Sequence, residues 1–224
     1  MTADMSDQDN GCGNSGPDDF CQGIVPHDMF EILMNGVFAF VMTLIVKTNI
    51  PLPQISASDD LVYLSQYLDM VSGDLLNFFF TFVILAIMYI LFFEMLRNIR
   101  ALDRYFVYLS FGFILSLVFM PMTSLLYSIS DKPIPYGIAF HANILVTGLV
   151  MIILWKHASS GGRLLYIKTN PAIVRNISLR LVLFPVTAVA GLLIDSWVES
   201  FGLIPDIILY MIPCIAFVLL SREP

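Results

Sequence analysis

Residues 35–44 read NGVFAFVMTL, an apolar run that begins beside a glycine and contains one threonine. The apolar character extends over residues 29–46, and Lys47 and Pro51 follow it. A helix needs roughly 20 mostly apolar residues to cross a bilayer core of about 30 Å, and proline cannot continue a helix. The stretch therefore predicts a membrane-spanning helix that ends shortly after Lys47.

The composition of the whole chain supports the same class of protein. Of its 224 residues, 58% are hydrophobic and 13% are charged, and the mean hydropathy is +0.81. These values lie outside the range of soluble domains. We predict an all-α, polytopic membrane protein with a six-helix transmembrane domain over residues 28–222 and no nucleic-acid partner. The six predicted spans are residues 29–46, 75–96, 104–127, 136–155, 177–197 and 201–220.

The first 27 residues differ in character from the rest. They contain five aspartates among Gly, Ser, Asn and Pro, without the basic and apolar regions of a signal peptide. This composition predicts a disordered acidic cytoplasmic tail at residues 1–27, with an acidic interaction arm as the alternative. Cys12 and Cys21 lie in this tail and Cys214 in the last span, so we expect free thiols and no metal site.

Basic residues in the loops predict the orientation, because short cytoplasmic loops hold the excess of Lys and Arg. Lys47 and Lys132 fall on one side of the membrane, and the other nine of the eleven basic residues fall on the opposite side. We therefore expect the N and C termini to be cytoplasmic. The basic side carries Arg97, Arg100, Arg104, Lys156, Arg163, Lys168, Arg175, Arg180 and Arg222.

The sequence also predicts local contacts for several other residues. Residues 61–69 are read as a short interfacial helix. Glu94 is expected to pair locally with Arg97 and Asn98. His141 and Asn143 are expected to form hydrogen bonds between helices, with pH sensing by His141 as the alternative. No nucleophile with a partnered base and no phosphate-binding loop is present in the sequence, which predicts that the chain is not an enzyme and needs no cofactor.

A set of motifs resembles a known family. Gly36 to Leu44 followed by Pro51 is similar to the first span of the endolysosomal potassium channel family, also called the transmembrane protein 175 family, in its six-span prokaryotic form. Residues 96–104, LRNIRALDR, resemble the basic turn after the family's second span. Pro121, Asn143, the Trp155-Lys156 pair and the Asn170-Pro171 pair follow in the family's order, so that the likeness covers residues 29–220.

The chain departs from this family at its signature. The family's first span carries Arg-x-x-x-Phe-Ser-Asp before the glycine and packs against a His pair on the second span. The matching positions are here Met29, Leu33, Met34 and Asn35, and the His pair is replaced by Phe92 and Phe93. Loss of a buried charge together with its partner can be neutral for stability, so the fold is expected to survive.

The resemblance implies a homotetramer whose first spans line a central pore. By position, Phe40 and Leu44 would form the pore constriction, and Thr43 would be a polar pore-lining residue. At 100° per residue, Gly36, Phe40, Thr43, Leu44 and Lys47 share one helix face about 100° wide, with Asn35 on the side toward the second span. Phe40 and Leu44 could instead contact lipid or the core. Lys47 is either a charge at the outer mouth or a side chain that snorkels to the interface.

Two functions are left open by the sequence. The first is a potassium channel in a prokaryotic plasma membrane, with K⁺ as the permeant ion and the lipid bilayer and three further copies of the chain as partners. The acidic loops on the less basic side favour it, because they raise the local cation concentration. The second is a non-conducting membrane scaffold or accessory subunit that retains the channel fold. The altered signature and Lys47 favour the second function.

Overall fold

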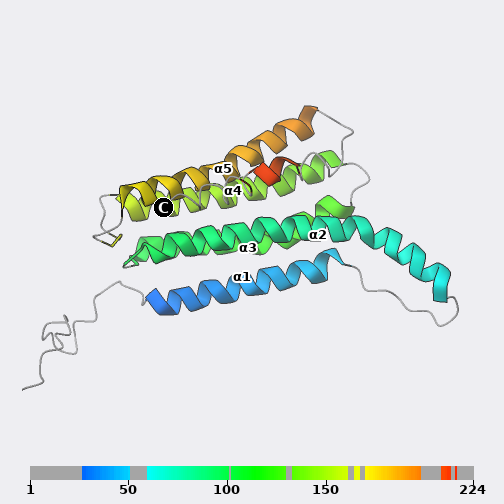
Figure 1. Ribbon diagram of the computed structural model, residues 1–224, viewed down its shortest axis with the longest axis horizontal. Helices are drawn as coiled ribbons and strands as arrows, with labels where there is room; N and C mark the ends of the chain where they lie inside the picture. Colours follow the sequence, from blue (N-terminus) through cyan, green and yellow to red (C-terminus); the bar gives the residue numbers. More distant parts are fainter. Residues whose placement is uncertain are drawn as a thin grey trace, which may run out of the picture.

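Five long helices form the part of the protein that the computed structural model describes, which comprises residues 27–50, 60–100, 102–129, 133–160, 164–166, 170–197, 208–212 and 215. Successive helices run in opposite directions in an up-and-down bundle (Figure 1). All five contain a stretch long and apolar enough to cross a membrane. The helices are α1 (His27–Asn49), α2 (Asp60–Arg97), α3 (Arg104–Ile129), α4 (Pro133–Ser159) and α5 (Pro171–Trp197).

These helices agree with the first five predicted spans, with differences at the ends. α2 begins at Asp60, so the predicted interfacial helix at residues 61–69 is the first part of α2 and not a separate element. α5 begins at Pro171 and not near residue 177, because Asn170 caps it: its Oδ1 accepts the backbone N–H of Ala172 at 3.0 Å. The predicted sixth span, residues 201–220, lies outside the described residues except for 208–212 and 215, which are helical.

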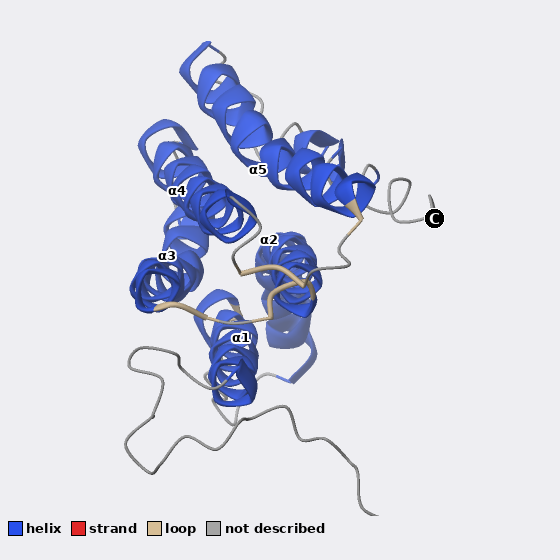
Figure 2. Ribbon diagram, turned by 90° about the vertical axis from the view of Figure 1, so that its left-hand side faces the viewer, coloured by secondary structure: helices blue, strands red, loops and turns tan. Residues whose placement is uncertain are grey.

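The packing of the helices leaves α1 at one edge. α1 packs on α2 and α3, and α4 packs on α3 and α5. Seen along the bundle, α2 and α3 lie on one side of α1, and α4 and α5 lie beyond them (Figure 2). One continuous core of buried apolar side chains joins the five helices, with Phe38, Phe92, Phe113 and Phe184 among its largest members.

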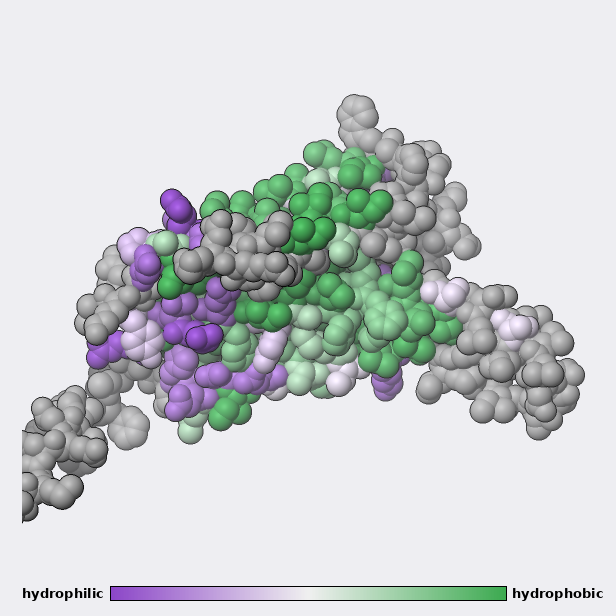
Figure 3. Space-filling view, in the orientation of Figure 1, coloured by the Kyte–Doolittle hydropathy of each residue, from purple (hydrophilic) through white to green (hydrophobic). Residues whose placement is uncertain are grey.

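The segment between α2 and α3 and the segment between α4 and α5 meet at one end of the bundle. Ile99 after α2 forms an isolated antiparallel bridge with Leu165, and the N–H of Arg100 donates to the carbonyl of Leu164 at 2.7 Å. Asp103 caps α3 through the N–H of Phe106 at 2.7 Å, and its other carboxylate oxygen lies 2.8 Å from His157 Nε2 on α4. We call this the basic end, and Figure 3 shows hydrophilic residues gathered there and hydrophobic ones along the rest of that face.

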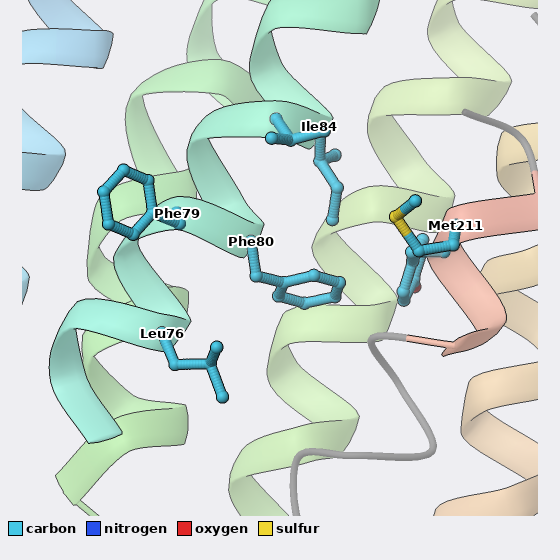
Figure 4. A pocket seen from close by; sticks show the side chains of 7 residues that line it. Leu76, Phe79, Phe80, Ile84 and Met211 are labelled. Atoms are coloured by element: carbon cyan, nitrogen blue, oxygen red, sulfur yellow. The ribbon is translucent and has the colours of Figure 1, made fainter. Parts of the chain in front are cut away.

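The short helical segment 208–212 packs against the bundle near the opposite end. Tyr210 is buried, and its ring lies 5.6 Å from that of Phe80 on α2. Beside this contact is an apolar cavity of about 180 Å³, into which Phe80 and Met211 point (Figure 4). Large apolar side chains also cover much of the outside of the bundle, as expected for helices in contact with lipid; examples are Tyr108, Leu115, Val186 and Leu193.

Candidate functional site

α1 has one buried face and one open face. The buried residues recur every three or four positions, which places them along one side of the helix against α2 and α3. They are Phe30, Met34, Phe38, Val41, Ile45 and Asn49. Apart from Asp28 in the first turn, the exposed residues form the opposite side, which we call the open face: Met29, Ile32, Leu33, Gly36, Ala39, Phe40, Thr43, Val46 and Lys47.

Four of the five residues assigned to one face from the sequence lie on this open face. Phe40 is 59% exposed, Thr43 and Lys47 are exposed, and a Cβ added to Gly36 would meet no atom within 4 Å. Leu44 is half-buried at the margin of the face. The Thr43 hydroxyl donates to the carbonyl of Phe40 at 2.8 Å, so its oxygen lone pairs remain available to a cation or to water.

The four altered signature positions are divided between the two faces of α1. Met29 and Leu33 lie on the open face, whereas Met34 is fully buried. Asn35 is half-buried and accepts a hydrogen bond from the Tyr89 hydroxyl on α2 at 3.0 Å. A polar contact between α1 and α2 therefore remains at one of the altered signature positions.

An aromatic cluster surrounds that hydrogen bond and fixes the rotation of α1. The ring of Phe38 lies 5.2 Å from Tyr89 and 6.0 Å from both Phe92 and Phe113. Phe92 and Phe113 are stacked at 5.0 Å with an interplanar angle of 14°. Such pairs stabilise a packing beyond the area that they bury. With Phe38 held between α2 and α3, Phe40 and Thr43 point away from them.

A buried polar cluster fixes α1 at the end away from the basic end, and sequence reasoning missed it. Ser124 Oγ on α3 accepts hydrogen bonds from the side-chain amides of Asn49 at 3.1 Å and Asn77 at 3.2 Å, and lies 2.8 Å from Thr81 Oγ1. All four side chains are buried. The sequence does contain a sign of this cluster. Asn77 and Thr81 are polar residues one turn apart in an apolar span, so they lie on one helix face and can contact the same neighbouring helix.

At the basic end, α1 is attached more loosely. His27 Nε2 lies 3.3 Å from the carbonyl of Leu96 on α2, and His27 Nδ1 lies 4.0 Å from Glu31 on its own helix. His27 and Glu31 are both partly exposed. α1 is thus held at both ends and in the middle, while its open face has no neighbour among the described residues.

Glu94 does not pair locally as expected. Arg180 Nη1 on α5 donates to both Glu94 carboxylate oxygens, at 2.8 and 3.0 Å. Arg180 is 4% exposed and lies inside α5, not in the loop to which the sequence assigned it. Asn98 donates to the backbone carbonyl of Glu94 and not to its carboxylate. The prediction failed because the pair joins α2 and α5 across 86 positions of sequence, which helix spacing cannot reveal.

His141 and Asn143 both form hydrogen bonds between segments. His141 is fully buried; its Nδ1 lies 2.8 Å from the Tyr210 hydroxyl, and its Nε2 lies 3.2 Å from Asp195 on α5. Asn143 donates to Thr123 Oγ1 on α3 at 3.4 Å. These contacts join α4 to its neighbours away from the open face of α1. Within the described residues, no group of three His, Cys, Asp or Glu side chains could hold a metal ion.

Fold and site together define a helical membrane protein in which one edge helix presents a partly polar face. Residues 29–121 match the family model of the endosomal/lysosomal potassium channel TMEM175. The fold matches the crystal structure of a lysosomal potassium-selective channel TMEM175 homolog from Chamaesiphon minutus. That match has a TM-score of 0.70 and 19% identity, and it covers 88% of this chain and 98% of that one.

The two matches confirm the resemblance that the sequence motifs suggested. Residues 29–121, which contain most of α1, α2 and α3, are similar to the TMEM175 family, and the chain has the fold of a bacterial homolog. The family is one of ion channels and not of enzymes. A search of the curated proteins gives no match.

Proposed function

We propose that the protein is a potassium channel formed by four copies of the chain, with the open face of α1 lining a central pore. The observation that carries this proposal is the unpartnered α1 face. The membrane-spanning stretch of α1 is 28% buried, against 39–44% for the other four helices. The TMEM175 family assignment supports the same function.

The composition of the open face favours a pore over lipid. A face in contact with acyl chains gains from bulky apolar residues along its whole length, and polar groups there are costly. The open face instead includes Gly36, Thr43 and Lys47 among its apolar residues. Four such faces around an axis would place the Thr43 hydroxyl oxygens near permeating ions.

In the proposed pore Phe40 forms the constriction, with Leu44 beside it. A ring of apolar side chains excludes water, because an ion that passes must lose part of its hydration without a polar replacement. Phe40 is the bulkiest side chain of the open face and is 59% exposed, so it would narrow the proposed lumen. Leu44 is half-buried and would narrow the pore from the margin of the face. This arrangement predicts a low conductance.

Potassium flux into liposomes tests the constriction. Replacing Phe40 with alanine should raise flux, because a smaller side chain admits water into the narrow region. Phe111→Ala is the matched control, since Phe111 is also a phenylalanine, is 54% exposed and lies on α3. A rise with Phe40→Ala alone supports the proposal. Equal flux for the two variants would overturn the role of Phe40.

Lys47 supports the alternative, a non-conducting scaffold. It is exposed in the last turn of α1, on the open face. Four ammonium groups at the mouth of a pore would repel cations, whereas a side chain that snorkels to the interface would not. Lys47→Gln should increase flux if the ring of charges exists, and unchanged flux would indicate snorkelling. A reconstituted wild-type protein without any ion leak would favour the scaffold.

The rest of the proposed architecture follows the family pattern. The domain over residues 28–222 would contain a sixth span at residues 201–220, and residues 1–27 would form an acidic tail. The basic end would face the cytoplasm of a prokaryotic cell, with both termini on that side. K⁺ would be the permeant ion, and no cofactor is required. Accessibility of Cys12 to an impermeant thiol reagent, in intact cells and after permeabilisation, would test the placement of the N terminus.

A further inference from the structure

A cavity opens between α4 and α5 near the basic end, far from the open face of α1 in the bundle. Its volume is about 200 Å³, and the two helices contribute all of its lining. Trp155 on α4 forms one wall, where its indole N–H donates to Ser178 Oγ on α5 at 2.9 Å. Ser178 in turn donates to the carbonyl of Val174, so the indole is held in a fixed position.

The lining changes from apolar to polar along the helix axes. Ile152 and Val182 line the part of the cavity nearer the middle of the two helices. Lys156, Ser159 and Ser178 line the part nearer the helix ends. α4 runs toward the basic end and α5 runs away from it, so the apolar parts of both helices lie at the same depth. The lining of the cavity therefore changes from apolar to polar in the same direction as a bilayer leaflet does, from the acyl chains to the headgroups.

Its outer part is also positively charged. Lys156 is exposed in the last turn of α4, and Arg175 is exposed one turn before Ser178 on α5. Neither forms an ion pair with another described residue. A partly open slot with an apolar inner part, with Lys156 in its lining and Arg175 one turn from Ser178, is complementary to a molecule that has a negative head and an apolar tail. Lys and Arg near a membrane surface each favour anionic lipid.

We propose that this slot binds one anionic phospholipid. Its phosphate would lie beside Lys156 and Arg175, and one acyl chain would lie along Ile152 and Val182 against the Trp155 ring. This site is independent of the proposed pore, because it uses α4 and α5 and no residue of α1. It would join the two helices at the point where the chain passes from α4 to α5.

Quenching of tryptophan fluorescence tests the proposal directly. The chain has two tryptophans, so the Trp197→Phe variant leaves Trp155 as the reporter. This variant is reconstituted in vesicles with a small fraction of brominated lipid, either phosphatidylglycerol or phosphatidylcholine. Bromine quenches at contact range, so stronger quenching by the anionic lipid reports its preferential binding beside Trp155.

Two further substitutions separate the slot from general attraction of anionic lipid. Lys156→Gln should reduce the preference for brominated phosphatidylglycerol by about fivefold, the effect of one basic charge near a lipid surface. Arg104→Gln removes an exposed basic residue at the start of α3 and should leave the preference unchanged. Val182→Phe should reduce quenching by both lipids, because it fills the apolar part of the cavity.

Two results would overturn the proposal. One is equal quenching of Trp155 by the anionic and the neutral brominated lipid, which would show ordinary boundary lipid without selection. The other is an equal loss of preference in Lys156→Gln and Arg104→Gln, which would show a diffuse effect of charge at the basic end.

Discussion

At the scale of single residues, the ion pair between Glu94 and Arg180 carries the clearest energetic consequence. Arg180 is buried, and removal of one partner of a buried pair leaves an uncompensated charge. Breaking a fully buried pair lowers the free energy of unfolding by about 3–5 kcal/mol. We expect a smaller loss when Arg180 is removed, because the Glu94 side chain that remains is 33% exposed and partly solvated. The melting temperature in detergent should therefore fall strongly for Arg180→Met.

The double variant Glu94→Leu, Arg180→Met should recover much of that loss, because no charge remains unpaired. Arg104→Met, which removes an exposed arginine, is the control and should change the melting temperature little. A double variant that is less stable than Arg180→Met would contradict the interpretation of the pair.

Ser124 is the second residue with a specific consequence, because its hydroxyl group contacts three side chains from two other helices, α1 and α2. In Ser124→Ala the Asn49 amide loses the oxygen to which it donates, at a cost of about 1–3 kcal/mol for an unsatisfied buried donor. The Asn77 amide keeps the backbone carbonyl of residue 124, to which it donates at 3.0 Å. Ser116→Ala is a matched control, since the buried Ser116 hydroxyl donates only to Phe113 of its own helix. Equal thermal stability of the two variants would remove the proposed role of Ser124 in holding α1.

At the scale of elements, α4 and α5 approach each other closely at two glycines, Gly148 on α4 and Gly191 on α5. A Cβ at Gly191 would lie 2.5 Å from the His141 ring, so the ring would have to move. Gly191→Ala should lower the melting temperature, because His141 would have to leave Tyr210 and Asp195.

Gly112→Ala on α3 provides the comparison for this prediction, since a Cβ there meets no atom within 4 Å. Alanine favours a helix by up to about 1 kcal/mol over glycine, so this variant should be equally or more stable than the wild type. Similar melting temperatures for both alanine variants would show that His141 adjusts without cost.

The helices were more predictable than the contacts between them. Apolar runs of membrane-spanning length predicted α1 to α5, since length and composition alone determine them. The face of α1 was also predictable in part: 100° per residue places Gly36, Phe40, Thr43 and Lys47 together, and the structure has all four exposed. Leu44, in contrast, is half-buried. Its exposure depends on the rotation of α1, which the packing of Phe38 against its aromatic neighbours determines. The spacing of residues along one helix cannot reveal that rotation.

The missed residues belong to contacts between distant parts of the chain. The pairing of Glu94 with Arg180 and of Ser124 with Asn49 requires the relative rotation of two or three helices. Single-helix patterns contain no information about that rotation. The start of α5 was misplaced for a local reason, since Asn170-Pro171 is a cap followed by proline at the first helical position.

At the scale of the whole molecule, the account depends on the assembly. An edge helix with a partly polar open face is incomplete in a single chain, and a central axis would bring four such faces together. Native mass spectrometry of the purified protein should therefore give the mass of four chains of 25.1 kDa each. A monomer at all detergent concentrations would remove the central pore.

The most direct test of the proposed pore is chemical block of potassium flux at Thr43. In a chain with Cys12, Cys21 and Cys214 replaced by serine, Thr43→Cys places one thiol on the open face. Leu115→Cys places a thiol on an exposed position of α3 as control. We predict that a positively charged methanethiosulfonate reagent blocks potassium flux through Thr43→Cys liposomes and not through Leu115→Cys liposomes. Flux that persists equally in both after modification of the thiols would contradict a pore lined by α1.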